Sequence, residues 1–523
     1  MKNVFENPIE YRKELLEYVK IPSERRIHLG GKSFICVFFT KFCSVGCPFC
    51  FFRSDSRRYG IPQEMFEFSE YGIQKFINFL NSSNNGYLLI SGGGEPFEKK
   101  EYIYQTIKRA KTDMIVIVTS GIWAKELNQA EKIIFELYNS LKMRGDAAKV
   151  VLRLSVDKFH YQQLGFDVVN NIIRVFRENF INNEKFELRI HTMVDDTTVK
   201  NISFKINGCT FVATNQSCIS DNDSVVKIVP RSAKLLFEDG YEIFVGMAKR
   251  FFPNLLVDLN GNVAKHSLEV FAEDMKFSEY YNSSVVTNTD KSLGLDFWIN
   301  YNGNITTWGN QQLDRLNNLY VDSYAKIVED TYNDLISYSF IDKGYNYRNE
   351  IIGEVNPKAV LRSKAINIRD YVGAVILEEP NTALYYAIRV IQDYLLEGIL
   401  TDDNLIKLSD ELLMAIMSDK TTLIDMYNNS SYCIFNKYMC EEFEEDKWKD
   451  LFTLVVLGHY DVTSTQIEYA IKFFNMHAEN AISKIADISD IDRDEQYGRL
   501  IERITSMKLE AKTACILNNE GRR

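Results

Sequence analysis

Three cysteines lie in one short loop, Cys43-Ser-Val-Gly-Cys47-Pro-Phe-Cys50, directly after the apolar run 35–40. Cysteine thiolates are the usual protein ligands of iron–sulfur clusters, and a cubic four-iron cluster needs four corner ligands. Three closely spaced cysteines can hold three irons and leave the fourth iron for an external ligand. The spacing therefore predicts one [4Fe-4S] cluster with Cys43, Cys47 and Cys50 as ligands and with an open iron that can take part in catalysis.

Zinc is the main alternative metal for such a group of cysteines. A structural zinc site takes four protein ligands, usually arranged as two pairs in the sequence. No second cysteine pair and no histidine pair at zinc-finger spacing follows the loop. The cysteine pattern therefore favours an iron–sulfur cluster over zinc.

A glycine-rich segment with a carboxylate follows the second apolar run of the chain: Gly92, Gly93, Gly94 and Glu95, between Ser91 and Pro96. Glycine lets the backbone approach a bound ligand closely, and a carboxylate can accept hydrogen bonds from an ammonium group. A plain tight turn is the alternative for this motif taken alone. Its position at the end of a predicted strand favours ligand binding.

Apolar runs and amphipathic segments alternate over the first two hundred residues. Helices are predicted over 9–20, 69–82, 99–111, 124–143 and 166–180, and strands over 34–40, 87–91, 114–118, 149–155 and 186–193. Strands separated by such helices are typical of parallel βα units, whose functional side chains gather at the C-terminal ends of the strands. The order predicts an α/β fold, a partial (β/α)6 TIM-like barrel, with both motifs at one end.

The two motifs together resemble those of the radical S-adenosylmethionine superfamily. The resemblance rests on the spacing of the three cysteines, on the aromatic Phe49 before Cys50 and on Gly92 to Glu95, and it extends over residues 33–200. It implies that the amine and carboxylate of S-adenosylmethionine chelate the open iron. One electron then cleaves the sulfonium to a 5′-deoxyadenosyl radical, which abstracts hydrogen from the substrate. It also implies that Phe49 and the glycine motif contact this cofactor.

Polar residues after the third and fourth predicted strands are further candidates for cofactor binding. The resemblance places a cofactor-facing polar side chain at Ser120. Ser155 and Asp157 follow the fourth strand, and they can bind the methionyl carboxylate or the ribose hydroxyls of S-adenosylmethionine. A cap on the following helix is an equal alternative for this pair. Three neighbouring candidates are Lys158, His160 and His191, and a core position is at least as good an interpretation of His191.

Composition limits the partners and the compartment. A net charge of −11 and a pI near 5.3 argue against nucleic acid, which requires a basic face. The nine cysteines show no even spacing, which favours reduced thiols of the cytoplasm over disulfides. The N-terminus lacks a secretion signal, and no apolar run approaches the ~20 residues of a membrane span. We therefore expect a cytoplasmic protein with no nucleic-acid and no membrane partner.

The second half of the chain has a different pattern. Residues 256–263 and 298–305 each place Asn-Gly between apolar residues, which is a strong hairpin signal. These segments resemble the SPASM or twitch extension of peptide-modifying radical enzymes, which usually carries cysteines for auxiliary clusters. No cysteine occurs between residues 219 and 432, so we expect this extension to lack its metal.

Four regions follow from these patterns. An N-terminal helical segment spans residues 1–32, and a core barrel spans 33–235. A β-hairpin module covers 236–330, and a mainly α-helical region covers 331–523.

A radical enzyme acting on a ribosomally synthesised peptide is the function that these features favour. The peptide is inferred only from the resemblance of the extension. A small-molecule substrate such as a sugar, nucleotide or amino acid is the alternative with the same chemistry. A non-catalytic iron–sulfur or zinc protein is a third, which the glycine motif disfavours because a structural metal site does not need it. A flavodoxin- or ferredoxin-type electron donor is an expected partner.

Overall fold

The computed structural model describes most of the first half of the chain and part of the second. The described residues are 3–29, 31–45, 67–91, 93–181, 183–193, 196–220, 226–248, 285–287, 293–295, 297–301, 303–306, 317–357, 380–430 and 433. Four predicted site residues lie outside this set: Cys47, Phe49, Cys50 and Gly92. The predicted hairpin at 256–263 also lies outside it.

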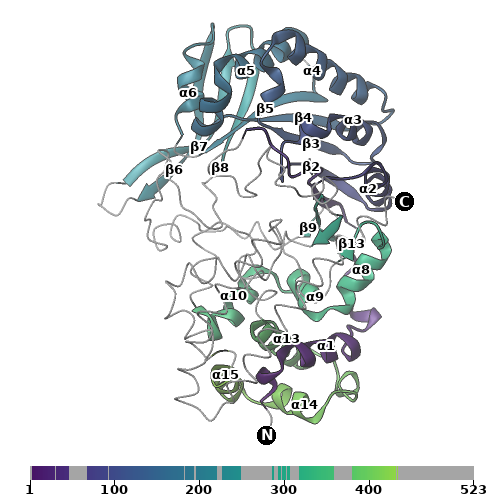
Figure 1. Ribbon diagram of the computed structural model, residues 1–523. Helices are drawn as coiled ribbons and strands as arrows, with labels where there is room; N and C mark the ends of the chain where they lie inside the picture. The colour runs from purple at the N-terminus through teal and green to yellow at the C-terminus, as the bar shows by residue number, and fades with distance from the viewer. Residues whose placement is uncertain are drawn as a thin grey trace, which may run out of the picture.

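One large sheet forms the centre of the N-terminal half (Figure 1). Its parallel strands run in the order β11, β1, β2, β3, β4, β5, β8. Their bounds are Phe297–Ile299, Ser33–Val37, Asn85–Ile90, Met114–Thr119, Lys149–Ser155, Phe186–Met193 and Glu242–Ala248. The predicted α/β fold is confirmed, since β1 to β5 and β8 are six parallel strands of the described chain.

Four helices cover one face of this sheet: α2 (Glu70–Ser82), α3 (Lys100–Arg109), α4 (Leu127–Lys142) and α5 (Lys158–Asn179) (Figure 1). The side chain of Ser69 caps α2 by accepting a hydrogen bond of 3.0 Å from the Gly72 amide. Alternate strand residues such as Leu152 and Leu154 are fully buried under these helices. The opposite face therefore carries the remaining residues of each strand.

Further strands extend the sheet on both sides. β6 (Cys209–Ser220) and β7 (Val226–Phe237) are antiparallel to their neighbours beyond β8. On the other side, β11 and β12 (Asn304–Thr306) form the predicted second hairpin, and β13 (Asn317–Asn318) follows. The predicted boundary between residues 235 and 236 thus falls inside β7. Two short strands, β9 (Val285–Thr287) and β10 (Leu293–Leu295), form a separate pair.

A helical unit follows the sheet in the chain and confirms the predicted helical character of the described C-terminal part. Its helices are α8 (Tyr324–Asn333), α9 (Leu335–Asp342), α10 (Gly344–Val355), α13 (Pro380–Leu396), α14 (Asp410–Met417) and α15 (Lys420–Asn428). Among the described helices, none combines the length and the hydropathy that crossing a bilayer requires.

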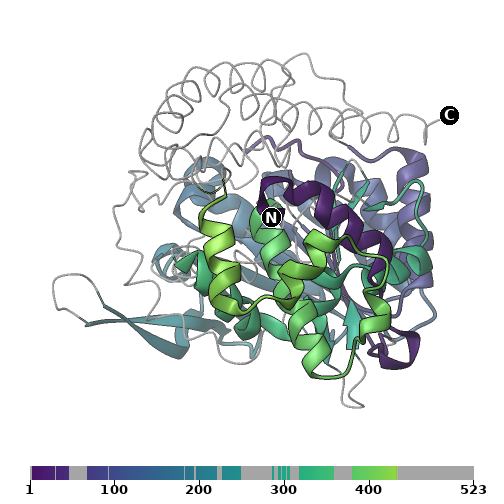
Figure 2. The same ribbon diagram turned by 90° about the horizontal axis from the view of Figure 1, so that it is seen from below.

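The N-terminal segment packs on this helical unit. Helix α1 (Pro8–Tyr18) lies against α13, as both views show (Figures 1 and 2). The side-chain amide of Asn3 donates to the Met426 carbonyl at 2.6 Å, and the Ser409 hydroxyl donates to the Glu14 carboxylate at 3.1 Å. The first and last described parts of the chain therefore form one unit.

Candidate functional site

The residues directly before and after the cysteine loop lie side by side at the C-terminal edge of the sheet. Thr40 and Glu67 form an antiparallel bridge, and the Phe68 amide donates to the Phe39 carbonyl at 2.9 Å. Half-buried Cys43 follows this bridge in the chain. The segment that carries the three cysteines is therefore held at its base directly beyond the C-terminal end of β1.

The glycine motif is bound to the start of the same loop by its backbone. The Gly94 amide donates to the Thr40 carbonyl at 2.6 Å, and the Glu95 amide donates to the Phe42 carbonyl at 2.8 Å. A Cβ atom on Gly94 would lie 2.0 Å from the Phe42 oxygen. Gly93 has a positive φ of 77°, and a Cβ there would lie 2.6 Å from the Thr40 oxygen. Glycine is required because the two segments lie this close.

Side chains add a second connection between the two motifs. The Ser44 hydroxyl, next to Cys43, donates to the Glu98 carboxylate at 3.3 Å. Glu98 belongs to the 3-10 helix η4 (Pro96–Lys99), which directly follows Glu95. The Lys99 ammonium of the same helix pairs with the Glu67 carboxylate at 2.5 Å. Both ends of the cysteine loop are thus tied to the segment after the glycine motif.

Glu95 is buried and contacts the end of β3. Its carboxylate accepts hydrogen bonds from the Thr119 hydroxyl (2.7 Å), the Ser120 amide (2.9 Å), the Ser120 hydroxyl (2.6 Å) and the Phe97 amide (3.3 Å). Burial raises the pKa of Glu95 above its usual range, and these four hydrogen bonds act in the opposite direction. The structure therefore brings the predicted residues Glu95 and Ser120 into direct contact, and the four donors occupy both carboxylate oxygens.

Two residues of this cluster were not identified from the sequence. Thr119 bonds to Glu95, and the indole of Trp123 donates to the Thr119 hydroxyl at 3.1 Å. Trp123 also packs on Phe97, with ring centroids 4.8 Å apart. Thr119 could have been predicted as a site residue, because it lies directly before Ser120 at the end of a predicted strand.

Ser155 and Asp157 have different local roles. β4 ends at Ser155, whose Cα partner on β5 is His191. Asp157 is buried and caps α5, accepting hydrogen bonds from the amides of Phe159 (2.9 Å) and His160 (3.0 Å). Its second oxygen lies 2.5 Å from Nδ1 of His160. The helix-cap alternative thus describes Asp157, whereas Ser155 stays at the end of its strand.

His191 lies beside Ser155 on the face of the sheet that the helices leave uncovered. Burial, together with the nearby charge of Arg153, lowers the pKa of His191 to about 4. Its imidazole is therefore neutral at neutral pH.

The site thus combines the Cys43 thiol, after the end of β1, with the glycine motif, after the end of β2. Residues 29–146 match a family model described as a 4Fe-4S single cluster domain. This range holds the three cysteines, the glycine motif and Ser120, and it is less than a quarter of the chain. The match confirms the cluster type that the cysteine spacing predicts for this part of the protein.

Other comparisons add little. No curated protein gives a significant match to this chain. A solved structure titled "Native anSMEcpe with bound AdoMet" is 13% identical, and the alignment covers 69% of this chain and 99% of that chain with a TM-score of 0.35. A likeness this distant carries no conclusion about the present chain.

Proposed function

We propose that this protein is a radical enzyme that uses S-adenosylmethionine at its [4Fe-4S] cluster. The observation that carries the proposal is the attachment of the glycine motif to the base of the cysteine loop, through the amides of Gly94 and Glu95. A structural cluster needs its thiolates but does not require a second motif fastened to the start of the cysteine loop. The 4Fe-4S family match over the same residues supports the assignment of the metal.

The residues fit such a site by their chemistry. Cys43, Cys47 and Cys50 supply three soft thiolate donors, which suit iron. When bound at these thiolates, the cluster would supply the single electron for reductive cleavage of S-adenosylmethionine, the chemistry that allows hydrogen abstraction from a substrate. Gly93 and Gly94 let the glycine motif lie directly against the Thr40 and Phe42 backbone, which places the motif beside Cys43.

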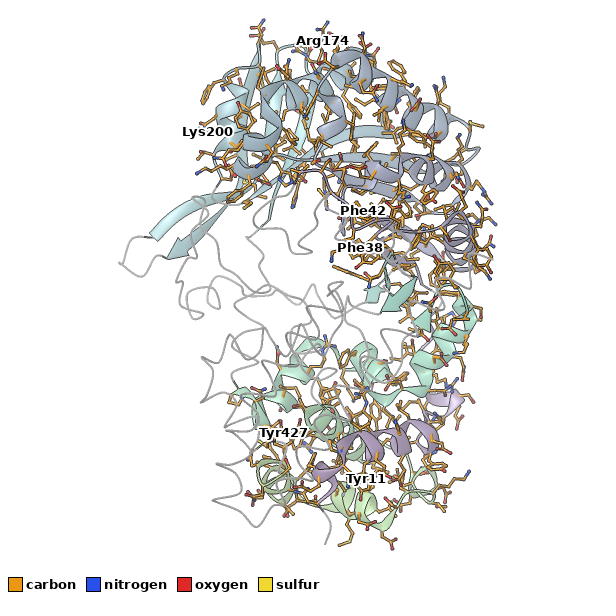
Figure 3. All side chains as sticks on the ribbon, in the orientation of Figure 1. Tyr11, Phe38, Phe42, Arg174, Lys200 and Tyr427 are labelled. Carbon is orange, nitrogen blue, oxygen red and sulfur yellow. The ribbon has the colours of Figure 1, made fainter. Side chains whose placement is uncertain are left out.

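Other residues hold this arrangement in place. Glu95 fastens the glycine motif to the end of β3, and because four protein donors occupy its carboxylate oxygens, its role is to position the motif. Phe38 and Phe42 are buried beside the loop, on the side of the sheet away from α4 and α5 (Figure 3). They shield the loop base from water. Phe49, Ser120 and Ser155 complete the proposed cofactor site, and Asp157 contributes to it as the cap of α5.

A ribosomally synthesised peptide is the proposed substrate. Support comes from the resemblance of the hairpin region to the extension of peptide-modifying radical enzymes. A small molecule is the alternative substrate for the same chemistry. An electron donor of the flavodoxin or ferredoxin type would reduce the cluster.

Anaerobic turnover tests the proposal. The full-length protein is reconstituted with iron and sulfide, reduced with dithionite and incubated with S-adenosylmethionine, and 5′-deoxyadenosine is quantified. We expect product from the wild type and none from Cys47→Ala. Cys209→Ala, outside the loop, is the matched control and keeps both the cluster and the product. A wild type that forms no more 5′-deoxyadenosine than Cys47→Ala contradicts the radical function.

A further inference from the structure

Several titratable side chains share the face of the sheet that the helices leave uncovered. Tyr87 on β2, Arg153 on β4, and Arg189 and His191 on β5 alternate with residues buried under the helices. Arg153 and Arg189 are Cα partners in the sheet, so two guanidinium groups lie on adjacent strands. Two guanidinium groups therefore lie next to each other on this face, and the Glu187 carboxylate lies two residues from Arg189 on the same strand.

Arg153 has no protein partner in the described part of the chain. Its Nε is buried and donates no hydrogen bond to a described residue, and no ion pair joins Arg153 to a described carboxylate. Arg189 differs, because its guanidinium pairs with Glu187. Glu187 also pairs with Lys149 at 2.5 Å, so this carboxylate is shared between two cations. A half-buried guanidinium without a counter-charge is costly unless a ligand supplies one.

The position of Arg153 relates it to the proposed cofactor site. Val37, Ile90, Ile117 and Leu152 form one row of Cα partners across β1 to β4. Arg153 is one residue beyond this row, at the level where β1 and β2 lead into the cysteine loop and the glycine motif. A ligand group bound to Arg153 would therefore lie on the face of the sheet opposite α2 to α5, next to the proposed reaction centre.

We propose that Arg153, with charge from Arg189, binds an anionic group of the substrate, a carboxylate or a phosphate. The inference rests on the proposed function, because it is this function that makes the face opposite α2 to α5 a substrate site. A guanidinium presents a planar fork of donors that matches both oxyanions. Tyr87 lies on the same face two strands away, and its phenol is near enough for the charge of Arg153 to affect it. The substrate class is thus an acidic peptide residue, a chain terminus or an anionic small molecule.

Inorganic phosphate is the probe for this site. It is titrated into the reconstituted full-length protein by calorimetry at low ionic strength, in a chloride buffer. We expect Arg153→Gln to weaken phosphate binding by about tenfold or more, as expected for loss of a charged hydrogen bond. Arg174→Gln is the matched control, since Arg174 is exposed on α5, pairs with Glu178 and lies on the outer surface (Figure 3). It keeps wild-type affinity.

Further variants and a competitor complete the test. Arg153→Lys keeps the charge and retains part of the affinity, and circular dichroism verifies that each variant is folded. Should Arg153→Gln fold poorly, the comparison of Arg153→Lys with the wild type decides, and equal affinities would contradict the fork-like recognition. No phosphate binding by the wild type, or equal binding by Arg153→Gln, overturns the inference.

The carboxylate of S-adenosylmethionine is the other anion that Arg153 could meet. S-adenosylmethionine is titrated without a reductant, so that it is not cleaved. If it displaces phosphate and Arg153→Gln weakens the binding of S-adenosylmethionine, Arg153 binds the cofactor and the substrate assignment is wrong. Simultaneous binding of both supports the assignment. These titrations do not require cleavage of S-adenosylmethionine. The 5′-deoxyadenosine assay therefore tests the proposed function independently of the Arg153 inference.

Discussion

At the scale of single residues, the position of Gly94 is decided by the backbone of another loop. Its amide bonds to Thr40, and a Cβ would lie 2.0 Å from the Phe42 oxygen. This contact is with backbone, so no side chain can rotate to make room.

We expect Gly94→Ala to separate the glycine motif from the cysteine loop and to cost about 1–3 kcal/mol of the free energy of unfolding. Iron content after reconstitution and urea unfolding measure the two effects. Gly145→Ala is the matched control, because nothing lies within 4 Å of a Cβ at this exposed glycine. Equal stability and equal iron content in the two variants would contradict the close approach.

His191 gives a prediction about pH. Its folded-state pKa of about 4 lies below its usual value, so between about pH 6.5 and pH 4 the unfolded chain binds a proton that the folded chain does not. Stability therefore falls as the pH falls through this window, by up to about 3 kcal/mol. We expect His191→Gln to remove this part of the pH dependence. Urea unfolding of both proteins from pH 7 to pH 4 measures it, and parallel curves would refute the assignment.

At the scale of elements, β11 is the strand that places the second half of the chain beside the site. It pairs in parallel with β1, and the Phe38 amide donates to the Ile299 carbonyl at 2.9 Å. Phe38 packs edge-to-face on Trp298, with ring centroids 5.5 Å apart. β11 thus supports β1 directly before the cysteine loop begins.

Truncation of Ile299 tests this support. Its side chain is fully buried, so Ile299→Ala should cost about 2–5 kcal/mol of the free energy of unfolding. Hydrogen exchange of β1 should also accelerate, because β11 covers its edge. Val321→Ala, at a residue that is 61% exposed, is the control and should change neither quantity. Unchanged exchange of β1 in Ile299→Ala would mean that β11 does not stabilise it.

At the scale of the whole molecule, α1 joins the two ends of the described chain. Leu15 and the buried residues of α13 belong to the same hydrophobic core. Phe5 packs against Tyr385 and Tyr427. The Tyr332 hydroxyl donates to the Ile27 carbonyl at 2.7 Å, just before the chain enters β1. The N-terminal segment is therefore part of the helical unit.

Leu15→Ala should destabilise the helical unit by about 2–5 kcal/mol. Hydrogen exchange of α13 is the measurement that matters, since α13 is remote from residue 15 in the sequence. The exposed residue Lys13 on the same helix provides the control, and Lys13→Ala should leave the exchange of α13 as it is in the wild type. Faster exchange confined to α1 would contradict a shared core.

The elements that the sequence predicted correctly are those with local signals. The βα order and the bounds of β4 and β5 follow from residue spacing within one element and from turn residues next to it. The same holds for the cysteine spacing, which specifies the number of thiolate ligands and hence the cluster type.

The tertiary structure decided the contacts that join distant segments. The Glu95–Ser120 bonds, the pairing of β11 with β1 and the packing of α1 on α13 depend on which buried surfaces fit together, and local periodicity does not encode this. The choice between strand face and helix cap for Asp157 likewise depended on where β4 ends. The sequence could not predict that Arg153 and Arg189 are neighbours, because this depends on the register of β4 against β5. A shift of one residue would have placed the two side chains on opposite faces of the sheet.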